Sequence, residues 1–175
     1  MHAPLLTKND DPRAGPYGLI NPPDQIQMIQ KEIELRLDHS RPRKRNRSVI
    51  ALDISIGAII EELDRHKLTK HTLIIFMSDN NKAKSSVYDD GVSVPAAIFW
   101  QDRLLSRVYS ELFANVDILP TVLDAAGIEY EPHHFDGRSA WWALTGKDKP
   151  PRRYLMLEQG FSRSLVSRDG WKYIR

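Results

Sequence analysis

Residues 72–81 read Thr-Leu-Ile-Ile-Phe-Met-Ser-Asp-Asn-Asn, and they decide the interpretation of the whole chain. Leu73 to Met77 is an unbroken apolar run bounded by polar residues. A run this short, rich in Ile and Phe, is typical of a strand buried on both faces of a parallel sheet. Ligands in open α/β sheets bind just beyond the carboxyl ends of such strands. The stretch therefore predicts a binding site directly after Met77.

Asp79 and Asn80 occupy that position, and Lys84 follows closely. A carboxylate and an amide offer the oxygen atoms that a hard divalent cation selects. The lysine ammonium is suited to hold an anion against the metal. The residues alone leave a second interpretation open, an ordinary turn, because Asp and Asn often bond their own backbone there.

The composition limits the classes of function. A chain of 175 residues is long enough for one domain with a core, and 41% hydrophobic with 27% charged residues is ordinary for a globular protein. A net charge of +2 does not indicate a nucleic-acid partner, and no apolar run is long enough to span a membrane. Cysteine is absent, which excludes disulfides and thiolate nucleophiles. Met1 is followed at once by His2, so no targeting segment is expected.

The remaining sequence predicts helices and strands on either side of this stretch. Amphipathic periodicity predicts helices over residues 24–38, 48–66 and 116–126, the last ended by Gly127, and a short helix is expected within 138–144. A second strand is expected over 96–100, and alternating apolar residues from Tyr154 onward predict a small antiparallel sheet.

Residues 41–47 form the densest cluster of positive charge. One interpretation is a solvated loop between two helices; the other is a surface that binds a polyanion such as a sulfated glycan. Asn46 also begins an Asn-Arg-Ser glycosylation pattern, which has meaning only on the secretory route.

Several segments, taken together and in order, resemble the sulfatase family. Ser78-Asp79-Asn80, Lys84 and Tyr88 to Pro95 are similar to the family pattern S-D-N-G, K-G-x-x-x-E-G-G-x-R-x-P, with Lys84 eleven positions before Pro95. Further segments with counterparts in the family are His2-Ala3-Pro4-Leu5, residues 51–57, 116–121 with 126–128, 136–139 and 171–174.

The resemblance implies an α/β fold of the alkaline-phosphatase superfamily. The expected architecture is part of a mostly parallel sheet with flanking helices, followed by a small antiparallel β segment. Residues 1–150 would be the C-terminal part of the catalytic domain, and residues 151–175 the start of a small β subdomain. The N-terminal half of the catalytic domain would be a missing partner.

The resemblance also implies a sulfuric ester hydrolase of the arylsulfatase type, acting on a sulfated small molecule or glycan. Asp79 and Asn80 would bind Ca²⁺ or Mg²⁺, while Lys84 and His2 would bind the sulfate and act in catalysis. The family attacks sulfur with a formylglycine made from Cys or Ser in a C/S-x-P-x-R motif. This chain has no match, because the nearest string, Ser40-Arg-Pro-Arg-Lys, lacks the final Arg. Lysosomal or secreted localisation is implied as well.

Three departures bear on activity. Asn81 stands where the family has Gly, Asp89-Asp90-Gly91 stands where it has Glu-Gly-Gly, and Ser93 stands where it has Arg. Because the N-terminal half with its nucleophile motif is absent as well, we expect no turnover from this chain alone. The alternatives are a phosphoesterase or phosphonate hydrolase of the same superfamily, and a non-catalytic remnant that binds polyanions through Arg41 to Arg47.

Overall fold

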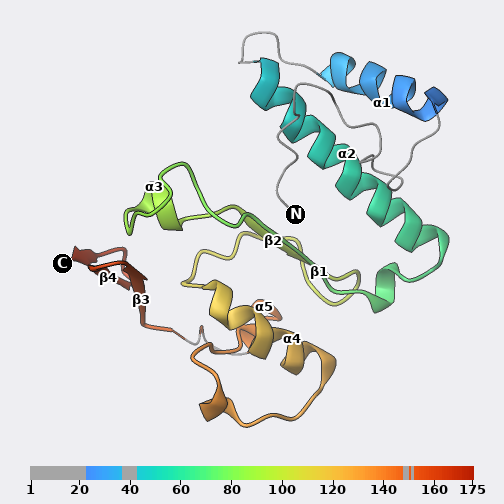
Figure 1. Ribbon diagram of the computed structural model, residues 1–175. Helices are drawn as coiled ribbons and strands as arrows, with labels where there is room; N and C mark the ends of the chain where they lie inside the picture. The colour runs from blue at the N-terminus through green and yellow to red at the C-terminus, as the bar shows by residue number, and fades with distance from the viewer. Residues whose placement is uncertain (1–22, 37–42, 148–149, 151) are drawn as a thin grey trace. The chain divides into compact units, whose positions relative to one another are not determined.

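The computed structural model describes residues 23–36, 43–147, 150 and 152–175 (Figure 1). The chain separates into two compact units, one ending at Thr72 and the other running from Leu73 to Arg175. Among the described residues, no helix combines the length and the apolar character needed to cross a bilayer.

The first unit is built on two helices that pack side by side, α1 (Pro23–Arg36) and α2 (Arg43–Arg65), followed by a 3-10 turn at Thr69–His71. Ile33 and Ile50 form the buried contact between the helices, with Ala51 and Ile54 packed against it. The Arg36 guanidinium bridges the helices by donating to Asp53 Oδ2 over 3.2 Å. The helix predicted over 24–38 is confirmed to within two residues at each end.

The prediction of a loop through the basic cluster is wrong for residues 43–47. These residues form the first turns of α2, which begins five residues before the expected Ser48. Arg and Lys are good helix formers, so a run of them extends a helix where no Gly or Pro intervenes. Arg47 also forms an ion pair with Glu34 of α1, which ties this turn to the neighbouring helix.

The second unit begins with strands β1 (Ile74–Met77) and β2 (Ala96–Phe99), and both positions were predicted. Their pairing corrects the expectation of a parallel sheet. Ile74 faces Phe99 and Met77 faces Ala96, so the strands are antiparallel, as are all strand pairs within the described residues. Every residue of β1 is half-buried and none is buried. The continuous apolar run of β1 is therefore found in a partly covered antiparallel strand, and such a run does not by itself indicate a strand buried on both faces.

Short helices lie between the strands of this unit. Residues Asp89–Val92 form α3 in the link between β1 and β2, and the 3-10 turn Asn115–Asp117 leads into α4 (Ile118–Ala126). Gly127 ends α4 in the left-handed region, with φ 69°, as predicted from its position. A 3-10 turn at Pro132–His134 and helix α5 (Trp141–Leu144) follow.

The C-terminal sheet contains β3 (Tyr154–Gln159), β4 (Ser162–Ser167) and β5 (Lys172–Ile174) in the order β3-β4-β5. The predicted antiparallel arrangement is confirmed. One face carries exposed Met156, Leu165 and Tyr173, which lie opposite one another in register. The other face carries Leu155 and Ser164, which are more covered. The predicted domain boundary at residue 150 stays a prediction.

Candidate functional site

The candidate site lies where β1 ends. Asp79, Asn80 and Lys84 line one cavity of the second unit, together with residues of the β1–β2 sheet. Leu157 and Gln159 of β3 line the same cavity, so the C-terminal sheet supplies part of its wall. The structure thus gathers three of the four residues predicted for the metal and sulfate site around a single hollow.

The turn after β1 is held by its own polar groups. The backbone N–H of Asn80 donates to Asp79 Oδ1 over 2.9 Å, and Ser78 Oγ donates to the Asn80 carbonyl over 2.8 Å. Asp79 is exposed and Asn80 is half-buried. Asp79 thus bonds the adjacent backbone, as the turn interpretation expects, and it also lines the cavity, so the roles proposed for it stay predictions.

Lys84 is carried by a compact loop between β1 and β2. The N–H of Ala83 donates to the Asp90 carbonyl over 2.9 Å, and Asn81 Nδ2 donates to the Ser93 carbonyl over 2.7 Å. A Cβ on Gly91 would lie 2.3 Å from the Ser86 carbonyl oxygen, so only glycine allows this close approach. Asn81, a departure from the family pattern, thus helps to close the loop that presents Lys84.

The donor set suits a hard divalent cation in part. Carboxylate and amide oxygens are ligands that Ca²⁺ and Mg²⁺ prefer, and Ca²⁺ takes about six to eight of them. Asp79 and Asn80 offer two such side chains at adjacent positions. In the part of the chain that the structure describes, no group of three or more His, Asp or Glu residues could hold a metal ion. These residues therefore fit one portion of a coordination shell.

Charged and phenolic groups from residues 107–111 line the same cavity. Arg107 donates to the carbonyls of Ala143, over 2.5 Å, and Leu144, over 2.9 Å, at the end of α5. Glu111 forms an ion pair of 3.0 Å with Arg168. Burial raises the pKa of Tyr109, and the negative charge of Glu111 raises it further. These residues were not predicted, since nothing in residues 105–111 resembles a motif.

Two predicted site residues have no described side chain. His2 lies outside the described residues, and so do Arg41 and Pro42 of the basic cluster. Asn46 lies in helix α2, where only its backbone is described. The roles of His2 and Asn46 stay predictions.

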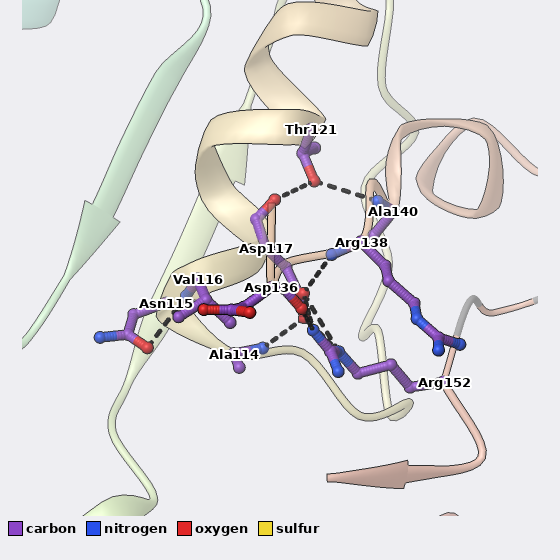
Figure 2. A network of polar contacts seen from close by, with 9 residues as sticks. All are labelled: Ala114, Asn115, Val116, Asp117, Thr121, Asp136, Arg138, Ala140 and Arg152. Atoms are coloured by element: carbon purple, nitrogen blue, oxygen red, sulfur yellow. Dashed lines mark hydrogen bonds and ion pairs between the residues drawn. The ribbon is translucent and has the colours of Figure 1, made fainter. Parts of the chain in front are cut away.

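A second polar network, around the fully buried carboxylate of Asp117, escaped prediction (Figure 2). The Arg152 side chain binds both carboxylate oxygens through two nitrogens, Nε lying 2.9 Å and 3.0 Å away. The backbone N–H groups of Ala114 and Arg138 donate to Asp117 Oδ2 and Oδ1 over 2.9 Å and 2.7 Å. The same hydrogen bonding, led by the Asp117 contact, raises the pKa of Arg152.

Thr121 extends this network through α4. Its hydroxyl donates to the Asp117 carbonyl over 2.6 Å and accepts from the Ala140 N–H over 3.0 Å. Gly137 passes so close that a Cβ there would lie 1.8 Å from the Val116 carbonyl oxygen. Residues 116–121 and 136–139 were noted only as segments with counterparts in a family. The structure gives them a physical role, because each supplies groups to the same buried cluster.

Comparison with known proteins identifies the family. The sequence profile described as Sulfatase matches residues 2–128. The chain belongs to the sulfatase family. Human arylsulfatase A is 29% identical over 124 residues, which are 62% of this chain and 24% of that protein. An extracellular sulfatase SULF-1 homolog of Drosophila melanogaster is 30% identical over 118 residues, 62% of this chain and 10% of that protein.

Solved structures show that the sulfatase chain shares their fold. A structure from work on glycosaminoglycan metabolism by Bacteroides thetaiotaomicron has a TM-score of 0.66 at 24% identity, covering 75% of this chain and 33% of the other. A phosphonate monoester hydrolase from Silicibacter pomeroyi has a TM-score of 0.63 at 20% identity, covering 93% and 37%. The predicted α/β class and the predicted family are both confirmed. The sulfatase chain spans about a quarter of the length of human arylsulfatase A.

Proposed function

We propose that this chain supplies part of the metal and sulfate site of a sulfuric ester hydrolase of the arylsulfatase type. The observation that carries the proposal is the shared cavity, which Asp79, Asn80 and Lys84 line beyond the end of β1. Membership of the sulfatase family supports the sulfate ester as the substrate class.

Each residue would have a distinct task. Asp79 and Asn80 would contribute oxygen ligands to Ca²⁺, or to Mg²⁺ in its place, and the bound cation would stabilise negative charge on the sulfate. Lys84 would neutralise a sulfate oxygen and assist departure of the alcohol, and His2 would act as general acid. The wall formed by Leu157 and Gln159 would exclude water from one side of the ester.

This chain does not contain the sequence motif that the nucleophile of the family requires. Formylglycine requires a C/S-x-P-x-R motif, and none occurs in these 175 residues. We therefore derive no attack on sulfur from this chain. The remainder of a sulfatase catalytic domain would have to supply the nucleophile and further metal ligands.

Substrate and location follow from the same proposal. A sulfated small molecule or glycan is the expected substrate. One structural neighbour was solved with a neocarrahexaose bound, which supports a glycan. A relative is named an extracellular sulfatase, which supports secretion among the two expected locations, secreted and lysosomal.

Calorimetric titration of the purified chain with Ca²⁺ tests the metal site. Asp79→Asn removes the charged ligand, and we expect it to weaken binding at least tenfold, about 1.4 kcal/mol. Asp169→Asn is the matched control, because Asp169 is exposed in the turn after β4 and does not line the cavity. Equal affinity of the wild type and Asp79→Asn would refute Asp79 as a ligand.

An aryl sulfate hydrolysis assay with Ca²⁺ tests the role of the chain as a partial site. We expect no turnover, because the nucleophile motif is absent. Metal-dependent product release above that of a Lys84→Ala variant would contradict this expectation. In a complete enzyme containing this segment, comparing aryl sulfate with aryl phosphate would separate a sulfatase from the phosphoesterase alternative.

A further inference from the structure

The loop that presents Lys84 is linked to the C-terminal sheet by one long-range ion pair. Lys172 Nζ donates to Asp89 Oδ1 over 2.8 Å, joining residues 83 positions apart. Asp89 begins α3 in the loop, and Lys172 begins β5. The Asp89 side chain is 85% exposed, whereas that of Lys172 is only 16% exposed.

Register explains why Lys172 reaches the loop. Leu155 faces Val166, and Val166 faces Lys172, so these three side chains form a row across one face of the sheet. Leu155 lines the cavity that also contains Asp79 and Lys84. Lys172 therefore projects from the sheet face that walls the cavity. Its covered stem limits the number of positions that its ammonium can take.

The ion pair between Asp89 and Lys172 joins a side chain of the loop directly to a side chain of the sheet. The internal bonds of the loop, from Ala83 to Asp90 and from Asn81 to Ser93, fix its shape but not its placement against the wall. We propose that Lys172 is a positioning residue, which holds the Lys84 loop against the C-terminal sheet through Asp89. The inference rests on the proposed function only in taking Lys84 as the group that is positioned.

Hydrogen exchange of the full chain, without metal or ester, tests the inference. We expect Lys172→Met and Asp89→Asn each to speed amide exchange of residues 82–92 roughly two- to fivefold, the range of a partly exposed ion pair. The double variant should exchange no faster than either single variant, since both remove the same interaction. Lys172→Arg should keep most of the protection.

Arg163→Gln is the matched control, because it breaks the Glu158–Arg163 ion pair of the same sheet. It should leave exchange of residues 82–92 unchanged. Unchanged loop exchange in Asp89→Asn, whose side chain is too exposed to affect folding, would overturn the inference. Equal acceleration throughout residues 73–175 in Lys172→Met would also overturn it, because a general structural role would act in that way. If the loop responds but Ca²⁺ does not bind, the proposed function fails and the positioning role stands.

Discussion

Removing Arg152 should destabilise the second unit far more than removing an ordinary surface arginine. Asp117 is fully buried, and Arg152 donates charge-assisted hydrogen bonds to both of its oxygens from two nitrogens. Removing one partner of a buried ion pair leaves the other charge uncompensated, so Arg152→Met should lower the free energy of unfolding by about 3–5 kcal/mol. The carboxylate would keep the N–H groups of Ala114 and Arg138 as partners but would have no cation from Arg152.

Asp117→Asn should cost a similar amount for a different reason. Among the described residues, the hydrogen-bond partners of the carboxylate are donors, namely two backbone N–H groups and the Arg152 guanidinium. An amide has one acceptor oxygen and one NH₂ group, so one N–H must face another N–H. The double variant Asp117→Asn with Arg152→Met should lose less stability than the sum of the two single losses, because the residues share one interaction.

Urea denaturation followed by tryptophan fluorescence measures these losses, since all four tryptophans lie within residues 73–175. Arg163→Gln serves as the control, because its ion pair with Glu158 is about half exposed on both sides and should contribute at most about 1 kcal/mol. If Arg152→Met lowered stability by less than about 1 kcal/mol, the buried network would be no stronger than a surface ion pair, and the reasoning would be refuted.

Two further perturbations test other features of the fold. Gly137→Ala should destabilise the second unit by at least about 1–3 kcal/mol, because its Cβ would overlap the Val116 carbonyl. The control is Gly57→Ala in α2, which has nothing within 4 Å of the added Cβ and should be neutral or stabilising. The midpoints of urea denaturation of each variant and the wild type measure both effects. Because burial raises the pKa of Tyr109, the neutral phenol stabilises the folded state fully below the unfolded pKa of about 10, and this contribution is lost as pH rises through the folded pKa. Tyr109→Phe should therefore flatten the fall in urea midpoint as pH rises above about 10, and an unchanged alkaline slope would refute the assignment.

The elements that were predicted well are those with local causes. Helix α1 follows from its apolar period, the end of α4 follows from Gly127, and β1 follows from a bounded apolar run. The direction of strand pairing is different, because it depends on which strand becomes the neighbour. Half-buried Ile74 to Met77 have the composition of a buried strand but pair antiparallel with β2.

The candidate site was predicted in part for the same reason. Asp79, Asn80 and Lys84 are close in sequence, so a motif can place them in one cavity. Asp117 and Arg152 are 35 residues apart, and Lys172 and Asp89 are 83 apart, so no local pattern pairs them. A weak signal existed at Asp117, a charged residue directly before an apolar helix. An N-cap would have been the simplest interpretation, but the structure shows no side-chain cap bond from it to α4.

The buried carboxylate of Asp117 also affects how readily proteases can cleave the segment from Gly127 to Ala140. This segment has one 3-10 turn and would be taken for a cleavable linker from its lack of regular structure. Its far end is tethered at Arg138 and Ala140, both of which donate to the cluster. A protease needs several residues to unravel before it can cut, and here unravelling would expose the buried carboxylate of Asp117. The rate of proteolysis in this segment should therefore depend on the Asp117–Arg152 ion pair. A segment without regular secondary structure can still be held firmly in place.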